Sequence, residues 1–291
     1  MRLATYPTTS APPTIAWEER ACLLCGGARL TPLLESSDSH SGLKFLLVRC
    51  QRCGLCYTNP RPDSWSVQQF YPDTYRCHQA KEPSRRADPM KRILAQQTPA
   101  RLLDFGCGGG DFLARMHEAG WTVTGLDASG EAAGVARARG FAAHAGTLPH
   151  PLWMVPSFEA ITMRQSLEHT HEPLEVLEAA HHLLTPGGRL LVSVPNFDSL
   201  GRHWFGGDWH GLDVPRHLIH FTPATLKLML YRAGFSEIAL RQISRPSWIR
   251  HSAIRAGDRR WLRSRFGSGL AAAWARLRGH ADCLLATATR A

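Results

Sequence analysis

The sequence predicts an α/β fold, in which a mostly parallel sheet covered by helices follows a small cysteine-rich domain. Two observations lead to this prediction. From residue 99 onward, short apolar strands alternate with amphipathic helices, as in an open doubly wound sheet. In front of them, five of the eight cysteines lie between Cys22 and Cys56, most of them in paired C-x-x-C units.

The length of 291 residues accommodates one such domain and a small module. No stretch approaches the roughly 20 apolar residues of a membrane span, and no apolar run near the start resembles a secretory signal. We therefore expect a cytoplasmic protein. Its expected parts are a flexible N-terminus (1–20), a zinc-ribbon domain (21–60), a helical linker lining the cleft (61–98), and an α/β domain (99–291) with a basic helical insertion (246–279).

Two C-x-x-C-G units, separated by 24 residues, predict a metal site. Each unit can form a knuckle in which two thiolates approach one ion and the glycine permits the tight turn beneath it. Four thiolates complete a tetrahedral zinc site with no position left for water, so we expect a structural zinc. We expect Cys56 to be a small buried residue instead of a ligand. The predicted ligands are Cys22, Cys25, Cys50 and Cys53.

A glycine-rich turn follows the first strand of the α/β domain. The strand Arg101–Phe105 leads into Gly106-Cys-Gly-Gly-Gly110 and then a helix, and the next strand ends at Asp127. This unit is typical of adenosyl-binding sites: glycines let the backbone approach the ligand, the helix N-terminus offers N–H groups, and the acid accepts hydrogen bonds from the ribose. A dinucleotide fingerprint would need a third glycine at 111, where Asp stands.

The G-x-G-x-G spacing resembles motif I of class I S-adenosylmethionine (SAM)-dependent methyltransferases, and Asp127 matches the acid that follows that motif. The resemblance covers about residues 99–291 and implies a Rossmann-like sheet of seven strands, the last one hairpinned. The loop after the third strand departs from the pattern, because Thr147 stands near the place of the usual acid. The cofactor-binding residues that the resemblance implies are Asp104, Gly106, Cys107, Gly108, Gly110, Asp127, Ala128, Thr147 and Gln165.

The cysteine pairs joined to this core resemble bacterial methyltransferases with an N-terminal zinc-binding domain, a group related to the sugar C-methyltransferases. The segment from Trp209 to Pro223 resembles the same broader group. This resemblance implies methyl transfer to a small-molecule, sugar or glycan acceptor. An RNA methyltransferase that binds RNA through the ribbon and an Arg-rich segment ranks second, because the ribbon has few basic and aromatic residues. A SAM-binding module without catalysis is the third hypothesis.

An oxygen or carbon acceptor also needs a base to remove its proton. Glu168 and His169 follow the fourth strand, at the carboxyl edge of the sheet where ligands bind. His217 lies in a Pro- and His-rich loop that we expect at the same cleft. These three are the predicted catalytic residues, although His169 could instead pack near the adenosine and His217 could position substrate. We expect His220 to be structural.

The positive charge of the chain is concentrated near the C-terminus. Residues 241–278 contain ten arginines and one acid, Asp258, interleaved with large apolar residues from 246 onward. The favoured interpretation is a helical lid with a solvated arginine face. Two alternatives remain: peripheral contact with anionic lipid or a lipid-linked substrate at the inner membrane surface, and binding to RNA phosphates. The sequence does not indicate an oligomeric state.

Overall fold

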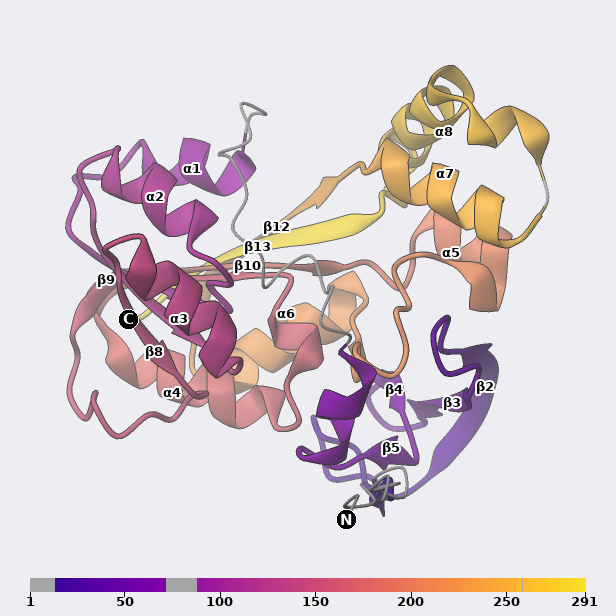
Figure 1. The fold of residues 1–291 in the computed structure, drawn as a ribbon, viewed down its shortest axis with the longest axis horizontal. Coiled ribbons are helices and arrows are strands. Elements are labelled where there is room, and N and C mark those ends of the chain that lie inside the picture. The colour runs from indigo at the N-terminus through magenta and orange to yellow at the C-terminus, as the bar shows by residue number, and fades with distance from the viewer. Residues whose placement is uncertain (1–13, 72–87, 258) are drawn as a thin grey trace, which may run out of the picture.

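The computed structural model describes residues 14–71, 88–257 and 259–291 (Figure 1). Its main sheet has seven strands in the order β12-β13-β10-β9-β6-β7-β8, which confirms the predicted Rossmann-like α/β fold. β13 runs antiparallel to both of its neighbours, as the predicted hairpinned strand should. The strands are β6 (Arg101–Phe105), β7 (Thr122–Asp127), β8 (Ala142–Ala145), β9 (Phe158–Arg164), β10 (Leu184–Pro195), β12 (Ser236–Ile243) and β13 (Cys283–Thr289).

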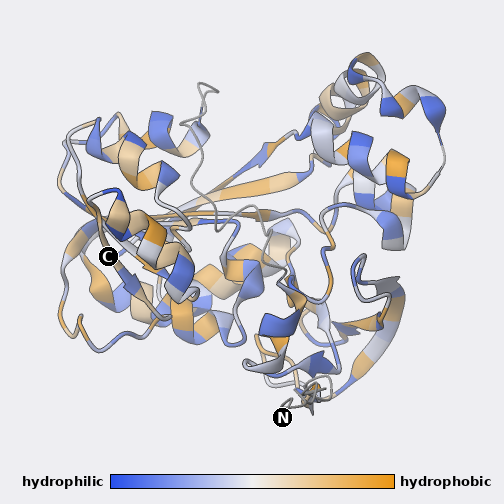
Figure 2. Ribbon diagram, viewed as in Figure 1, coloured by the Kyte–Doolittle hydropathy of each residue, from blue (hydrophilic) through white to orange (hydrophobic). Residues whose placement is uncertain are grey.

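Helices cover both faces of this sheet (Figure 1). Successive strand residues point to opposite faces, so Leu102 packs with one group of helices and Leu103 with the other. Figure 2 shows the apolar residues concentrated on the central strands between these layers. Helices α1 (Pro89–Leu94), α2 (Asp111–His117) and α3 (Gly130–Ala138) share the core of Leu102; α4 (Pro173–Leu183) and α6 (Pro223–Arg232) share that of Leu103.

The cysteine-rich domain is completed by a distant segment. Strands β2 (Leu30–Ser37), β3 (Lys44–Cys50) and β4 (Cys56–Thr58) form an antiparallel sheet, and β11 (Ile219–His220) pairs with β4 at its edge. The backbone N–H of Thr58 also donates to the Leu218 carbonyl at 2.9 Å. The ribbon expected over 21–60 is therefore not self-contained, because the α/β domain supplies its fourth strand.

The flexible N-terminus was expected over residues 1–20, but the last part of this range is ordered as a strand. Residues 1–13 lie outside the described part of the chain, but Trp17–Glu18 (β1) pairs with Arg61–Pro62 (β5). The guanidinium of Arg61 is buried and donates to Glu18 Oε1 at 2.7 Å and to the His171 carbonyl at 3.0 Å. This partly buried ion pair fixes the segment to the body of the protein.

The linker expected over 61–98 is described only at its ends. A 3-10 helix, η1 (Ser66–Phe70), follows β5, and α1 begins after Asp88, whose side chain accepts the backbone N–H of Met90. Residues 72–87, the middle of the predicted helical lining, lie outside the described residues.

The C-terminal insertion leaves the sheet at one edge. It consists of α7 (Pro246–Arg255), η4 (Arg260–Arg263) and α8 (Arg265–Leu277), between β12 and β13. Cys283 pairs with both Pro195 and Ile243, so the insertion begins at the carboxyl end of β10. There it lies beside α5 (Leu200–Phe205), as Figure 1 shows. None of the described helices is long and apolar enough to cross a membrane.

Candidate active site

The glycine loop and Asp127 lie together at the carboxyl edge of the sheet. The carboxylate of Asp127 accepts the backbone N–H of Gly108 at 2.8 Å and that of Ser129 at 2.9 Å. Its side chain remains partly exposed at the end of β7. This is the arrangement that the adenosyl site requires, with an acid beside a bare turn.

Two of the glycines in this loop are required by protein neighbours. Gly106 has φ +75°, and a Cβ there would overlap the Ser166 Cβ at the end of β9. At Gly110, with φ +83°, a Cβ would lie 3.2 Å from Ala136. The prediction attributed the glycines to the approach of the ligand; the structure adds that they let the loop pack on the sheet and on α3. The thiol of Cys107 is buried, so only its backbone faces the loop.

Asp104 is buried at the end of β6. Its carboxyl group accepts a hydrogen bond from the Thr162 hydroxyl at 2.7 Å. Burial raises the pKa of Asp104 to about 7. Its predicted contact with the cofactor stays a prediction.

The remaining predicted cofactor contacts surround the same edge. Gln165 has a left-handed backbone, with φ +55°, and its side chain donates to the Ser193 hydroxyl at 3.0 Å, which joins β9 to β10. Ala128 follows β7 and Thr147 follows β8, and both are exposed. Their positions suit a ligand lying across these strand ends.

Glu168 and His217 form a buried pair beside the glycine loop. Glu168 lies in the 3-10 helix Leu167–His169 (η2), is 0% exposed, and has no hydrogen-bond partner for either carboxylate oxygen among the described residues. His217 Nε2 lies 3.9 Å from Glu168 Oε1, beyond hydrogen-bond distance. Burial raises the pKa of Glu168 to about 8 and lowers the pKa of His217.

The tautomer of His217 follows from its other ring nitrogen. Nδ1 lies 2.9 Å from the Gly211 carbonyl oxygen. A carbonyl can only accept, so Nδ1 carries the proton and Nε2 keeps its lone pair. The group closest to Glu168 is therefore a proton acceptor.

His169 completes the predicted trio. Its Nδ1 lies 3.0 Å from both the Tyr71 hydroxyl and the Arg216 carbonyl oxygen, and its ring packs edge-on against His217 with centroids 4.7 Å apart. Burial lowers the pKa of His169 to about 3, which keeps the ring neutral. One ligand atom from each of Glu168, His169 and His217 lies within 4.8 Å of the others, so the structure brings the three predicted catalytic residues together.

The sequence prediction missed the arginine that supports this loop. Arg216 is 3% exposed and donates to both carboxylate oxygens of Asp213, at 2.8 and 3.1 Å, and to the Phe70 carbonyl at 2.7 Å. Its guanidinium also lies 3.0 Å from Asp38 of the ribbon. Burial alone would raise the pKa of Asp213, but hydrogen bonds from Arg216 hold this pKa well below its usual range. The Asp-x-x-Arg spacing beside His217 was the available signal.

The four predicted zinc ligands converge. The Sγ atoms of Cys22 and Cys53 are 3.4 Å apart, those of Cys25 and Cys50 are 3.5 Å apart, and all four lie within 4.8 Å of one another. These separations far exceed a disulfide bond of about 2.05 Å. They suit four thiolates around one ion with Zn–S bonds of about 2.3 Å.

The backbone of each knuckle turns as predicted. The N–H of Gly26 donates to the Cys22 carbonyl at 2.8 Å, and the N–H of Gly54 donates to the Cys50 carbonyl at 2.9 Å. Both glycines have positive φ, at +69° and +77°. Cys56 is buried in β4 and does not join the cluster, as predicted.

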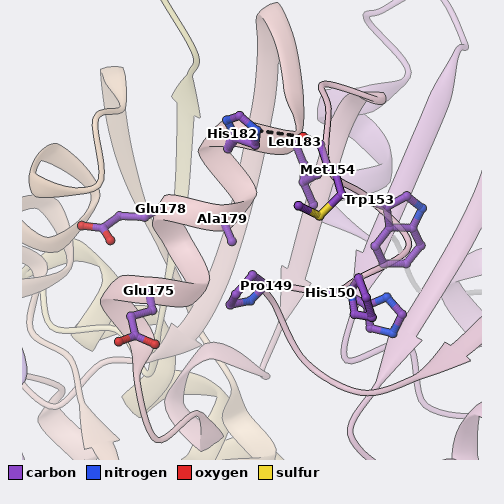
Figure 3. Close-up of a pocket in the computed structure, with 10 residues that line it drawn as sticks. Pro149, His150, Trp153, Met154, Glu175, Glu178, Ala179, His182 and Leu183 are labelled. Carbon is purple, nitrogen blue, oxygen red and sulfur yellow. Dashed lines mark hydrogen bonds between the residues drawn. The ribbon is translucent and has the colours of Figure 1, made fainter.

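A groove of about 580 Å³ lies elsewhere, between the loop 149–154 and α4 (Figure 3). His182 Nε2 is 3.1 Å from the Met154 carbonyl across it. The side chains of Glu175 and Glu178 point away from the loop in Figure 3. None of the predicted site residues lines this groove.

The fold and this site define a class I SAM-dependent methyltransferase domain. The chain belongs to the family described as methyltransferase domain, whose family model matches residues 78–240.

Comparison with known proteins adds relatives of this domain. The chain is 33% identical over 130 residues to the ubiquinone biosynthesis O-methyltransferase of Xylella fastidiosa (strain 9a5c). This match covers 41% of this chain and 53% of that protein. It is 36% identical over 103 residues to the enzyme of the same name from Aromatoleum aromaticum. This match covers 33% of this chain and 44% of that protein. The chain thus spans about half the length of the curated relatives it matches.

Solved structures show the same fold. A SAM-dependent methyltransferase from Archaeoglobus fulgidus superposes with a TM-score of 0.50 at 18% identity, over 69% of this chain and 90% of the other. A SAM-dependent methyltransferase from Mesorhizobium loti superposes with a TM-score of 0.50 at 22% identity, over 69% of this chain and 96% of the other. At these identities the similarity supports the fold alone.

Proposed function

We propose that this protein transfers the methyl group of SAM to a hydroxyl group of a small-molecule, sugar or glycan acceptor. The observation that carries the proposal is the buried carboxyl of Glu168, which lies beside His217 and has no hydrogen-bond partner in the described part of the chain. Ser166, two residues before Glu168, packs against Gly106, so this pair lies next to the glycine loop. When bound, SAM supplies a methyl group on a sulfonium; Asp127 would accept hydrogen bonds from its ribose, and the turn 106–110 would seat it.

His217 is the base that the geometry favours. As the acceptor oxygen bonds to the methyl carbon and the methyl–sulfur bond breaks, the hydroxyl proton must leave. Nε2 of His217 has the free lone pair that can take it, because the Gly211 carbonyl fixes the other proton on Nδ1. The resulting imidazolium would lie close to the ionised Asp213, whose negative charge would stabilise it, and 3.9 Å from Glu168.

Glu168 suits a second part in the same transfer. Burial raises its pKa to about 8, so the carboxyl group can gain or lose a proton near neutral pH. In its ionised form it can therefore share the proton that arrives on His217. His169 is held at Nδ1 by the Arg216 carbonyl and packs on His217, so it would keep the His217 ring in place.

The choice of acceptor rests on the relatives and on the ribbon. The curated relatives named above are O-methyltransferases of ubiquinone biosynthesis, which supports a hydroxyl on a small organic molecule. The four-cysteine domain in front of the core supports kinship with the sugar C-methyltransferases, and hence a sugar or glycan. RNA is the second candidate, and no described feature of the ribbon favours it.

Comparative mass spectrometry tests the proposal. Metabolites and glycans from cells with and without the gene should differ by one product that is heavier by one methylene when the gene is present. The purified protein, given SAM and extract fractions from the deletion strain, should release S-adenosylhomocysteine with the fraction that contains the acceptor. Intact SAM binding without turnover on any fraction, and no product lost on deletion, would contradict it.

We also propose that the four-cysteine cluster binds one structural zinc. The support is the convergence of four sulfur atoms on two glycine-terminated knuckles. Elemental analysis should find about one zinc per chain, and a strong chelator should lower the melting temperature. Cys22→Ser should lose the metal, whereas Cys56→Ser, outside the cluster, should keep it. A metal-free protein of unchanged stability would contradict this assignment.

A further inference from the structure

Helix α8 presents an apolar stripe to solvent. Phe266 is 78% exposed and Leu277 is 85% exposed, and Leu270 and Trp274 are exposed as well. At about 100° per residue, positions 266, 270, 274 and 277 fall on one side of the helix. Large apolar side chains on one contiguous face are typical of an interaction surface.

The opposite side of α8 packs on the protein through small residues. Gly267, Ser268, Ala271, Ala272 and Ala275 are buried. A Cβ at position 267 would overlap the carbonyl of Trp261, so the helix and η4 are in close contact. The fold therefore buries the small side chains and leaves the large apolar ones outside, the reverse of an ordinary surface helix.

Positive charge borders this stripe. The segment 246–278 contains eight arginines, no lysine and a single acidic residue, Asp258. Arg265 and Arg276 are exposed and project from the same flank of α8, while Arg260 and Arg263 are exposed on η4 beside Trp261. An apolar centre with a cationic border is complementary to a lipid surface that carries negative headgroups.

The stripe lies at the functional end of the molecule. The insertion begins where Cys283 pairs with Pro195, at the carboxyl end of β10. The glycine loop, Asp127 and Glu168 lie at or just after the carboxyl ends of β6, β7 and β9, on the same edge of the sheet. The insertion that carries α8 therefore starts at the same edge of the sheet as the candidate active site.

We infer that α8 and η4 form a docking surface for an anionic membrane, on which the protein binds peripherally. Exposed Phe266, Leu270 and Leu277 enter the interface between headgroups and acyl chains, and the arginines contact the lipid phosphates. Nucleic acid would use the arginines but not the aliphatic side chains, because bases stack on aromatic and guanidinium planes and gain little from leucine. The inference does not depend on the identity of the methyl acceptor.

Co-sedimentation of the full chain with lipid vesicles tests this surface. The protein should sediment with vesicles of phosphatidylcholine and phosphatidylglycerol, and stay in solution with phosphatidylcholine alone. The triple substitution Phe266→Ser, Leu270→Ser and Leu277→Ser should weaken binding about tenfold or more, because it removes the inserted apolar area. A matched triple substitution of exposed apolar residues elsewhere, Leu152→Ser, Met154→Ser and Val155→Ser, should bind like the wild type.

A second variant separates charge from apolar contact. Replacing Arg260, Arg263 and Arg276 by Gln should weaken binding to the anionic vesicles, and the wild type should bind less as salt rises. The inference fails if the wild type ignores anionic vesicles, or if the apolar variant binds them as tightly as the control. Salt-sensitive binding to RNA without vesicle binding would also overturn it and would assign the arginines to nucleic acid.

Discussion

Two buried ionisable groups lie near the same edge of the sheet, and their surroundings differ. Arg216 has a partner for each direction of its guanidinium: two carboxylates and one backbone carbonyl. Glu168, even more deeply buried, has none for either oxygen among the described residues. A buried charge with full partners holds a structure together, whereas a buried acid without them costs stability. The comparison supports a structural role for Arg216 and the proposed chemical role for Glu168.

The largest expected effect is on turnover. Glu168→Gln removes the group that can exchange the proton of His217, so we expect methyl transfer to fall by about 10²–10⁴-fold with SAM binding intact. Calorimetry of SAM binding and an assay of S-adenosylhomocysteine release would measure the two effects separately. Glu178→Gln, on the exposed face of α4, is the control and should retain full activity. Full activity in Glu168→Gln would remove Glu168 from the mechanism.

The next effect is on stability and concerns Arg216. Arg216→Met leaves the carboxylates of Asp213 and Asp38 without their shared cation, so the free energy of unfolding should fall by about 3–5 kcal/mol. Urea unfolding followed by fluorescence would measure it. Arg29→Met, at an exposed site on the ribbon, should change the free energy of unfolding little. A loss below about 1 kcal/mol for Arg216→Met would mean that this cluster does not hold the ribbon to the loop.

The pH dependence of stability sharpens the comparison. Folding raises the pKa of Glu168 to about 8, so the native state favours the protonated acid. The resulting stabilisation is complete below the ordinary pKa of glutamate and is lost as pH rises through about 8. The wild type should therefore lose stability relative to Glu168→Gln by up to about 1.4 kcal/mol per pH unit in this range. If the free energies of unfolding of the wild type and Glu168→Gln changed in parallel from pH 5 to 9, the pKa of Glu168 would not be raised by folding.

The smallest effect concerns Tyr71. Tyr71→Phe removes the hydroxyl that lies 3.0 Å from His169 Nδ1, but the Arg216 carbonyl still bonds that nitrogen. We expect a loss of about 1 kcal/mol in stability and a decrease of a few-fold in turnover. Thermal unfolding and the same methyl-transfer assay would detect both. A loss of activity as large as that of Glu168→Gln would place Tyr71 in the proton transfer itself.

The sequence predicted the features whose residues lie close along the chain. The cysteine knuckles, the glycine turn and the acid at 127 are local patterns with a direct physical reason. It also predicted that Glu168 and His217 face one cleft, because Glu168 follows the fourth strand and the Pro- and His-rich loop of His217 was expected at the same place.

Contacts between distant segments could not be predicted in this way. The strand Ile219–His220 has two residues, too few to show an alternating pattern, yet it closes the ribbon. Asp38 lies 178 positions before Arg216, and no spacing in the sequence indicates that pairing. The N-terminal strand was missed for the same reason, because its partner at Arg61–Pro62 contains a proline and only two residues.

One measurement tests most directly whether Glu168 is retained for chemistry. Urea unfolding at pH 8 would compare the wild type with Glu168→Met, which fills a similar volume without a polar group. Because no described residue partners the buried wild-type carboxyl, we predict that Glu168→Met is more stable than the wild type by about 1–3 kcal/mol, although it transfers no methyl groups. A variant that unfolds at a lower urea concentration than the wild type would contradict the account and make Glu168 a structural residue.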